Sequence, residues 1–290
     1  MNASSVEIGM EIAPPSPGSP LLLRVQDLAL IRGAAPLRRP FSFDCASAWI
    51  AVIGGNGVGK STLMLSLAGL LSQASGRIFV AKRSSEAGML LPLTERSQKE
   101  KAQSIAWMGQ SESINGRWLV ADLVSLGRLP WRDQDNSEAS GAIHASAQLW
   151  IEALGLEALW HRRLDQLSGG ERQRVLIGRT LAVDAPLILL DEPSLHLDPL
   201  YQMQLSGWLA ASASRGQLVL TATHDLNWAL SADAVLLLSK QNAPLLARVD
   251  CQNLHRAIES EMGGAIEIRA LDEQAGRRWH ALTRRTVIQK

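Results

Sequence analysis

A glycine-rich segment in the first third of the chain has the residue types that bind phosphate. Residues 54–62 read GGNGVGKST and match the pattern GxxxxGK[ST]. Glycines let the backbone curl so that several N–H groups point at one phosphate, Lys60 can neutralise the outer phosphates of a nucleotide, and the Ser61 hydroxyl can bind Mg²⁺. The alternative is a turn that merely joins a strand to a helix. The expected nucleotide-binding residues here are Gly54, Gly55, Asn56, Gly57, Val58, Gly59, Lys60, Ser61 and Thr62.

Two adjacent carboxylates follow an apolar run in the second half of the chain. Residues 187–193 read LILLDEP. If both carboxylates lie in a strand, they point to opposite sides. Asp191 at the carboxyl edge of the sheet can then reach a Mg²⁺ ion, whereas Glu192 can orient or deprotonate an attacking water. Such a pair alone is also typical of a solvated turn, but the phosphate-binding pattern upstream favours the catalytic interpretation.

Another segment, later in the sequence than the glycine-rich one, has the features of a second phosphate-binding site. Residues 164–174 read LDQLSGGERQR, with Ser168 as a helix N-cap and Glu171 three residues later to close a capping box. Gly169 and Gly170 leave the backbone exposed, and free N–H groups at a helix start attract anions. The segment lies more than a hundred residues after the first one, so the residues alone do not explain why one chain carries both.

Alternating apolar runs and helix-like stretches indicate the elements that hold these segments. A packed helix is expected directly after the glycine-rich segment, at 61–71, and residues 82–103 are polar enough for the surface. Helix-like stretches over 119–165, broken at Pro130 and Gly155, indicate an inserted helical region. Strands that alternate with helices argue for an α/β fold with a parallel sheet. Strands are expected at 21–30, 49–53, 104–110, 187–190, 217–223 and 234–239.

Composition bounds the class of protein. The chain has 290 residues, of which 46% are hydrophobic and 20% charged, as in an ordinary folded protein. A net charge of +1 provides no electrostatic basis for nucleic acid as the main partner. Cys45 and Cys251 are far apart without a CxxC motif, which indicates neither a disulfide framework nor a zinc site and fits a reducing cytosol. Residues 1–20 contain no Lys or Arg and no apolar h-region, so no secretion signal is expected. No later apolar run reaches 18 residues, so no membrane span is expected.

Taken together, these segments resemble the ATP-binding subunit of an ABC transporter. LSGGERQR is similar to the signature sequence of that family and lies between GGNGVGKST and LILLDEP. The resemblance covers most of residues 21–240 and implies an α/β fold: a P-loop NTPase parallel sheet (RecA-like core), with an inserted α-helical subdomain at about 111–167 and an antiparallel β edge. Residues 1–20, rich in Pro and Ser, are expected to form a disordered leader, and residues 241–290 a C-terminal extension of strand, helix and hairpin.

The resemblance also implies roles for single residues. Gln110 matches the Q-loop glutamine, which contacts Mg²⁺ and connects to the membrane partner, and His224 matches the switch histidine, which holds the γ-phosphate and the water. Without the resemblance, Gln110 would be interpreted as a surface residue at a strand end and His224 as a structural histidine. Glu192 and His224 are therefore the expected catalytic residues. The expected cofactors are ATP and Mg²⁺, and the expected metal ligands are Ser61, Gln110 and Asp191.

The family resemblance implies an active site that two copies share. Ser168, Gly169 and Gly170 of a second copy would close over the γ-phosphate that the loop around Lys60 holds. The expected partners are a second copy in an ATP-sandwich homodimer, integral membrane permease subunits and, indirectly, a substrate-binding protein, with no nucleic acid. The expected location is peripheral, at the cytoplasmic face of the cell membrane.

Three further segments resemble importers of iron-siderophore complexes, haem and cobalamin. They are VADLVSLGRLPW at 120–131, SLHLDP at 194–199 and HDLN at 224–227. Related importer classes share parts of each, and the GRLP segment could also be an ordinary loop with a helix-starting proline. The alternatives are the ATPase of another ABC transporter class and a soluble ABC ATPase that acts on ribosomes or DNA. A single set of motifs and no heptad run argue against the soluble class.

The chain departs from the family pattern at three places. Where the family places an aromatic ring against adenine, about 29 residues before Lys60, this chain has Ile31 and Arg32. Packing on Ile31 or on the Arg32 guanidinium could replace the ring, so weaker discrimination between ATP and GTP is expected. Leu195 stands where many relatives carry serine, and Asn56 replaces a common proline. Because the phosphate-binding and catalytic residues are intact, an active enzyme is expected.

Overall fold

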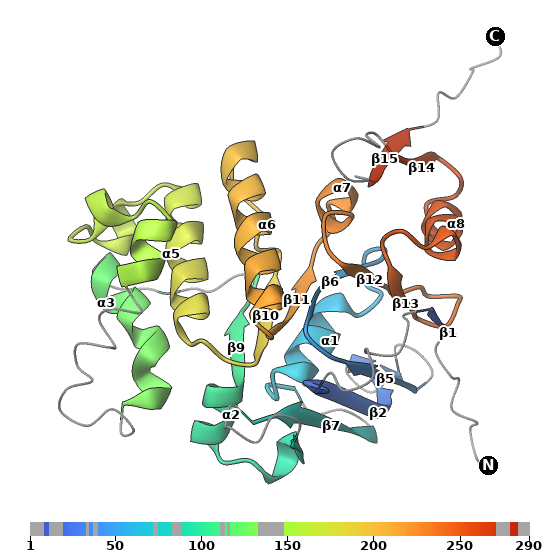
Figure 1. Ribbon diagram of the computed structural model, residues 1–290, viewed down its shortest axis with the longest axis horizontal. Helices are drawn as coiled ribbons and strands as arrows, with labels where there is room; N and C mark the ends of the chain where they lie inside the picture. The colour runs from blue at the N-terminus through green and yellow to red at the C-terminus, as the bar shows by residue number, and fades with distance from the viewer. Residues whose placement is uncertain are drawn as a thin grey trace.

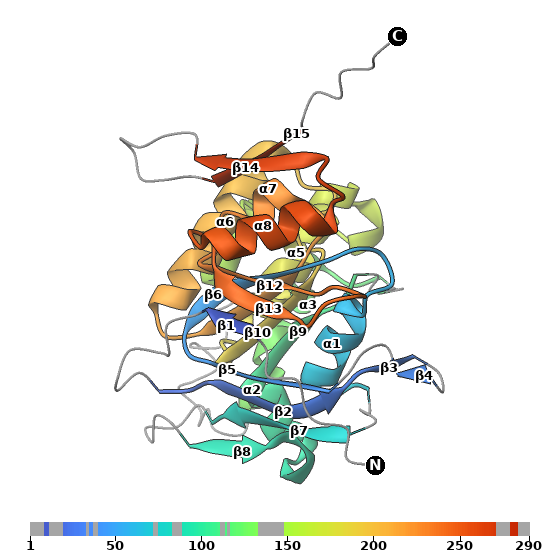
Figure 2. The same ribbon diagram turned by 90° about the vertical axis from the view of Figure 1, so that its right-hand side faces the viewer.

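A seven-stranded, mostly parallel sheet forms the centre of the protein (Figure 1 and Figure 2). Its order is β1-β13-β12-β6-β11-β10-β9, and the pairs from β12 to β9 run parallel, whereas β12 and β13 are antiparallel. The expected strands after residue 48 are all present, so the predicted parallel α/β core is confirmed. These strands are β1 (Gly9–Glu11), β6 (Ala48–Ile53), β9 (Ile105–Met108), β10 (Leu187–Asp191), β11 (Leu218–Ala222), β12 (Ala234–Leu237) and β13 (Leu245–Arg248). The computed structural model describes residues 9–11, 20–32, 35–36, 40–71, 75–82, 89–110, 114, 117–132, 148–270 and 279–283.

The two faces of this sheet carry separate hydrophobic cores. Along β6, Trp49, Ala51 and Ile53 belong to one core, and Ile50 and Val52 belong to the other, because side chains alternate across a strand. Helices α5, α6, α7 and α8 close the first core, and α1 with a second sheet closes the other. Strands β10 and β11 are therefore buried along their whole length. The helices are α1 (Lys60–Leu67), α5 (Gly169–Ala182), α6 (Pro199–Ser214), α7 (Leu226–Ala229) and α8 (Gln252–Glu261).

The second sheet is antiparallel, with the order β5-β2-β7-β8, and it is the antiparallel edge expected from the sequence. Strand β2 is the strand expected at 21–30, whereas β5 and β7 were not anticipated. Phe41, Phe43 and Cys45 alternate with less buried residues along β5, a period-two pattern that could have predicted this strand. The strands are β2 (Leu23–Ala29), β5 (Phe41–Cys45), β7 (Ser75–Ala81) and β8 (Leu90–Pro92), and a separate short pair is formed by β3 (Ile31–Arg32) and β4 (Ala35–Pro36).

The polar segment 82–103 contains regular structure. Helix α2 (Gln98–Ser104) begins there at the N-cap Ser97, whose side chain accepts a hydrogen bond from the N–H of Glu100. The Glu100 carboxylate accepts in return from the N–H of Ser97, which completes a capping box. Local capping therefore forms a helix in a stretch that lacks a strong apolar pattern.

The inserted helical region packs against α5. Helix α3 (Val120–Ser125) continues as a 3-10 segment over Leu126–Trp131. Pro130 lies inside this segment, and the helical turns end at Trp131, one residue after the predicted break. Gly155, with φ 60, ends the helical turns at 148–153, as predicted. Residues 111–113, 115–116 and 133–147 of this region lie outside the described residues.

A strand, a helix and a hairpin follow β12. They are β13, α8 and the antiparallel pair β14 (Ile266–Ala270) and β15 (Trp279–Thr283). Strand β1 pairs in parallel with β13 at Gly9–Glu11. The expectation of a disordered leader does not hold for these three residues, because the edge of β13 offers free backbone groups for pairing. The rest of the expected leader, apart from residue 20, lies outside the described residues.

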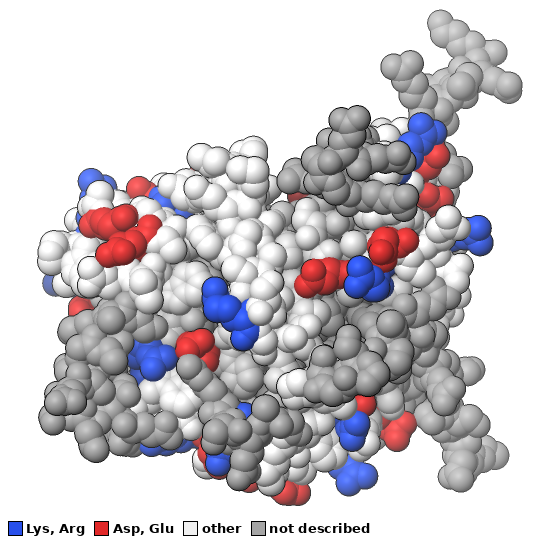
Figure 3. Space-filling model, in the orientation of Figure 1, with Lys and Arg blue, Asp and Glu red and all other residues white. Residues whose placement is uncertain are grey.

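The outer face of α6 carries no charge. The helix has 16 residues without Asp, Glu, Lys or Arg, and the surface above it lacks charged side chains in Figure 3. Leu200 and Met203 are exposed on it, while Leu205 and Leu209 are buried against the sheet. Neither α6 nor any other helix in the described part of the chain is long and apolar enough to span a bilayer.

Candidate functional site

The glycine-rich segment forms a loop between buried strand β6 and helix α1. Gly54 has φ 146, and a Cβ there would lie 2.2 Å from the carbonyl oxygen of Leu238, so no larger residue fits. Gly59 is the N-cap of α1 with φ 102 and offers no side chain to cap the helix. The first N–H groups of α1 therefore have no acceptor within the helix and face the loop. The Lys60 ammonium group reaches back over the loop and donates to the carbonyl oxygen of Gly54 at 2.8 Å.

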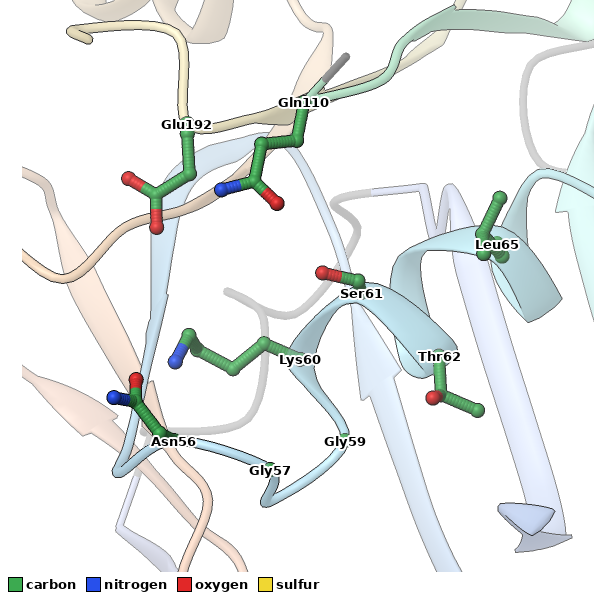
Figure 4. Close-up of a pocket in the computed structure, with 9 residues that line it drawn as sticks. All are labelled: Asn56, Gly57, Gly59, Lys60, Ser61, Thr62, Leu65, Gln110 and Glu192. Carbon is green, nitrogen blue, oxygen red and sulfur yellow. The ribbon is translucent and has the colours of Figure 1, made fainter. Parts of the chain in front are cut away.

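Residues from three distant parts of the chain line a cavity of about 390 Å³ above this loop. Figure 4 shows Lys60, Gln110 and Glu192 directed into the same space, Gln110 from the end of β9 and Glu192 from the end of β10. Val58, one of the expected nucleotide-binding residues, is instead buried in the core. Leu65 was not anticipated, although it lies one helical turn after Ser61. The lining residues are Asn56, Gly57, Gly59, Lys60, Ser61, Thr62, Leu65, Gln110 and Glu192.

Asp191 is a buried carboxylate at the carboxyl end of β10. Burial raises its pKa, the Ser61 hydroxyl opposes this by hydrogen bonding to the carboxylate, and the neighbouring charge of Glu192 raises the pKa further. Lys60 is close enough to act in the opposite direction. Carboxylate and hydroxyl oxygens are ligands that Mg²⁺ prefers. A cation between Ser61 and Asp191 would offset the cost of burying this carboxylate, so the donor set fits the expected metal.

Glu192 is not part of the strand, in contrast to the expectation of two carboxylates on opposite sides of it. Strand β10 ends at Asp191, and Glu192 has φ 54, a backbone conformation that costs roughly 1–3 kcal/mol in a non-glycine residue. Its N–H donates to the carbonyl oxygen of Ala222 at 2.9 Å, which holds the turn against β11. This hydrogen bond continues the parallel pairing of β10 with β11, and the chain leaves the sheet at the left-handed backbone of Glu192, whose side chain lines the cavity.

Glu192 and His224 form a close pair. The Nδ1 atom of His224 lies 2.9 Å from Oε2 of Glu192. The Glu192 side chain is only 8% exposed, whereas that of His224 is 66% exposed. Gln173, which the sequence analysis did not single out within LSGGERQR, donates from its side-chain amide to the carbonyl oxygens of Glu192 at 3.3 Å and Pro193 at 3.1 Å. A buried carboxylate paired with an accessible imidazole is suited to taking a proton from a water and orienting it.

The start of α5 has the predicted cap. The Ser168 side chain accepts from the N–H of Glu171, and the Glu171 carboxylate accepts from the N–H of Ser168 at 2.8 Å, so the capping box is confirmed. Hydrogen bonds to its carboxylate from the N–H of Ser168 and then from the Ser168 side chain hold the pKa of Glu171 below its ordinary value. A Cβ on Gly170 would lie 2.9 Å from the carbonyl oxygen of His196. The second glycine therefore lets the loop before α6 approach the helix start.

A second cavity, of about 210 Å³, opens at this helix start. It lies between the N-terminal ends of α5 and α6, and its residues are Ser168, Gly170, Glu171, Arg174, His196, Leu197, Asp198 and Tyr201. None of them lines the cavity above the loop 54–62, called the P-loop from here on. The described residues thus form two separate cavities, one above the loop 54–62 and one at the start of α5.

Of the two expected adenine contacts, only the Ile31 side chain is described, and Ile31 lines neither cavity. Ile31 is half-buried in β3, and it is absent from the described residues that line the P-loop cavity. The Arg32 side chain lies outside the described part of the chain. Leu195 is half-buried in the turn between β10 and α6, and its N–H donates to the carbonyl oxygen of Glu192 at 3.2 Å.

Comparisons with known proteins show which family and which relatives the chain is similar to. Residues 40–195 match the family described as ABC transporter. The chain is 35% identical over 219 residues to the hemin import ATP-binding protein HmuV of Bordetella pertussis, covering 72% of this chain and 79% of the relative. It is 34% identical over 229 residues to the protein of the same name in Streptomyces coelicolor, covering 78% of each.

Solved structures share the fold. An inward-facing metal-chelate type ABC transporter matches with a TM-score of 0.71 and 27% identity, over 91% of this chain and 97% of the other. A dimeric bacterial ABC transporter cassette matches with a TM-score of 0.67 and 19% identity, over 79% and 100%. The P-loop NTPase fold with its antiparallel edge is therefore shown by both the topology and its neighbours.

Proposed function

This chain belongs to the ABC transporter family, whose ATP-binding members are ATPases coupled to transport, and we propose that it drives a separate membrane permease for the import of haem or another iron chelate. The names of the relatives support this substrate class: two are hemin import proteins, and a structural neighbour is of the metal-chelate type. Iron-siderophore complexes fall within this class, whereas cobalamin rests on the sequence resemblance alone. The subunit would lie at the cytoplasmic face of the membrane.

The P-loop residues would hold the phosphates of ATP. The cavity is lined by the start of α1, with its free N–H groups, and by Lys60. The N–H groups have a partial positive charge and the Lys60 ammonium group has a full one, so both attract an anion. Lys60 would exchange its present bond to the Gly54 carbonyl oxygen for the outer phosphates. Asn56, Gly57 and Thr62 would line the remaining sides.

Ser61, Asp191 and Gln110 would hold Mg²⁺. The hydrogen bond between the Ser61 hydroxyl and the Asp191 carboxylate keeps the two oxygen ligands together, and Gln110 reaches the same cavity from β9. Mg²⁺, when bound, would neutralise the charge that develops on the phosphate oxygens. Removal of divalent cations with EDTA should therefore abolish hydrolysis.

Glu192 and His224 would activate the attacking water. The Glu192 carboxylate would accept the proton of the water, and the His224 imidazole would hold the carboxylate in place and hydrogen-bond the γ-phosphate. The 2.9 Å pair supports this division of roles, because one oxygen of Glu192 contacts His224 and the other remains for the water. The accessible position of His224 supports a contact with a ligand that enters from outside.

One observation carries the proposal of a dimer: the two cavities have no lining residue in common. The residues at the start of α5 are therefore not among those that line the P-loop cavity of their own chain. In a head-to-tail homodimer, Ser168, Gly169 and Gly170 of one copy would instead close over the γ-phosphate bound to the other. Two ATP molecules would then be enclosed, and hydrolysis would open the dimer, since ATP and ADP bind the closed and open states differently.

The substitution Glu192→Gln tests the catalytic assignment. Glutamine keeps the size of the side chain but cannot accept the proton, so kcat should fall by about 10²-fold or more, while ATP binding persists and the closed dimer accumulates. Turnover, nucleotide affinity and mass by light scattering measure these effects. Glu157→Gln, at an exposed position in the helical region, is the matched control. Normal turnover of the Glu192→Gln variant would contradict the assignment.

Co-purification tests the transport role. An importer ATPase should co-purify with a multispan permease, and loss of the protein should abolish growth on haem or an iron chelate as iron source. A permease for another class of ligand would favour the ATPase of a different ABC transporter. Association with ribosomes or DNA in place of a permease would favour the soluble class.

A further inference from the structure

The C-terminal hairpin lies against the short helix that follows His224. Both views show β15 beside α7 (Figure 1 and Figure 2), and the N–H of Ala281 in β15 donates a 2.8 Å hydrogen bond to Oδ1 of Asn227 in α7. Asn227 is three residues from His224 and is otherwise exposed. The hairpin is thus bonded to the segment that carries the proposed switch histidine.

Helix α7 depends on its neighbours for its position. It has four residues, and so short a helix satisfies few of its own backbone groups. Its inner side is fixed by Trp228, which is buried and packs against Trp49 with ring centroids 5.2 Å apart. Its N-terminal end is capped by Asp225, which accepts from the N–H of Trp228 at 3.0 Å. Asn227 extends this support to the outer side, where the hairpin lies.

The hairpin is itself anchored to the core through α8. Oε1 of Glu259 in α8 accepts a 2.9 Å hydrogen bond from the N–H of Ile268 in β14. The ring of Trp279 in β15 packs against the ring of His255 in α8, with centroids 4.4 Å apart. Ile268 is buried in the same core that α8 closes. The hairpin is therefore held in place by α8 and the core, and it can in turn fix the position of α7.

We infer that Asn227 is a positioning residue through which the C-terminal hairpin holds His224 against Glu192. The inference rests on the proposed role of His224 in hydrolysis. Because the His224 side chain is 66% exposed, little packing holds the ring, and its place depends on the backbone of the segment that ends in α7. The essential group on Asn227 is an oxygen acceptor, since the donor is the backbone N–H of Ala281.

Substitutions of Asn227 in the full-length chain test this inference. Asn227→Ala removes the acceptor and should lower kcat for ATP about three- to tenfold, the factor that the loss of one hydrogen bond corresponds to. KM and nucleotide affinity should change by less than about twofold, because the P-loop is untouched. Asn227→Asp keeps the oxygen and should restore kcat. Asn242→Ala, in a turn after β12, removes an amide of the same size elsewhere and should have no effect.

The background His224→Ala separates this inference from the proposed function. If Asn227 acts through His224, adding Asn227→Ala to His224→Ala should cause no further loss of the residual kcat. Full activity of His224→Ala would overturn the proposed role of His224 itself. If His224→Ala is impaired, three results would each overturn the inference. Asn227→Ala could have a normal kcat, or Asn227→Asp could be as slow as Asn227→Ala. Asn227→Ala could also lower kcat by the same factor in the wild-type and His224→Ala backgrounds. Thermal melting of each variant shows whether a loss reflects unfolding.

Discussion

Ser168 has two tasks under the proposed function, and the substitution Ser168→Asp separates them. Its Oγ atom accepts from the N–H of Glu171 at 3.3 Å and caps α5. Aspartate is as good an N-cap as serine, so the helix start should persist. Its carboxylate, however, would place a negative charge where the γ-phosphate bound to the second copy is proposed to lie. The variant should therefore fold and bind nucleotide but fail to close.

The magnitudes of the two effects differ enough to be told apart. Ser168→Ala loses the cap, which costs about 1 kcal/mol and lowers the Tm of a chain of this size by roughly 2 °C. Ser168→Asp should leave the Tm nearly unchanged. Two like charges about 4 Å apart near a protein surface repel by roughly 4 kcal/mol, which weakens the closed dimer by about 10³-fold per site.

The assay uses the Glu192→Gln background, in which ATP-bound dimers should accumulate. Dimer mass with ATP, nucleotide affinity of the dilute monomer and Tm are measured for each variant, and ATP turnover is measured with Glu192 intact. Ser97→Asp is the matched control, because Ser97 caps α2 in the same capping box with Glu100 and should leave dimerisation unchanged. The reasoning is refuted if Ser168→Asp still forms the ATP-bound dimer or hydrolyses ATP normally, or if it loses nucleotide affinity while still dimerising.

Two further predictions concern packing and nucleotide choice. Gly127→Ala should destabilise the protein by about 1–3 kcal/mol, because its Cβ would lie 2.2 Å from the carbonyl oxygen of Arg179 and 2.9 Å from the Cβ of Ala182. Gly207→Ala, in α6 with open space around the new methyl group, should stabilise the protein by up to about 1 kcal/mol. Thermal melting checks both substitutions, and the same melting temperature for the two variants would contradict the predicted difference between them. With Ile31 in place of an aromatic ring, the protein should hydrolyse GTP and ATP at similar rates, and a strict preference for ATP would contradict the loss of adenine stacking.

Sequence reasoning succeeded where the interacting residues are close along the chain. The turn from β6 into α1 needs glycine at Gly54 and Gly59, and both requirements are contained within GGNGVGKST. The capping box between Ser168 and Glu171 joins residues three apart. Apolar runs marked the central strands because burial on both faces requires continuous apolar character.

Sequence reasoning failed where distant segments decide the local conformation. β5 is a different case, because Phe41, Phe43 and Cys45 form the period-two pattern of a half-buried strand and could have predicted it. Glu192 has a left-handed backbone where the chain leaves β10, and its N–H still pairs with β11, an arrangement that the residues around it do not reveal. Gln173 reaches the turn after β10 from α5, a contact that its neighbours in LSGGERQR do not reveal.

The sequence by itself determined the chemical parts of this protein: a phosphate-binding loop, two carboxylates after a strand and a capped helix start. These depend on backbone conformations and hydrogen bonds within a few residues. Only the tertiary structure decided how the parts meet. It places His224 beside Glu192, 32 residues away in the sequence, and forms two cavities without a common lining residue. It also bonds the C-terminal hairpin to Asn227. Such contacts follow from the packing of helices and strands around shared cores, and local periodicity does not specify which distant surfaces come together.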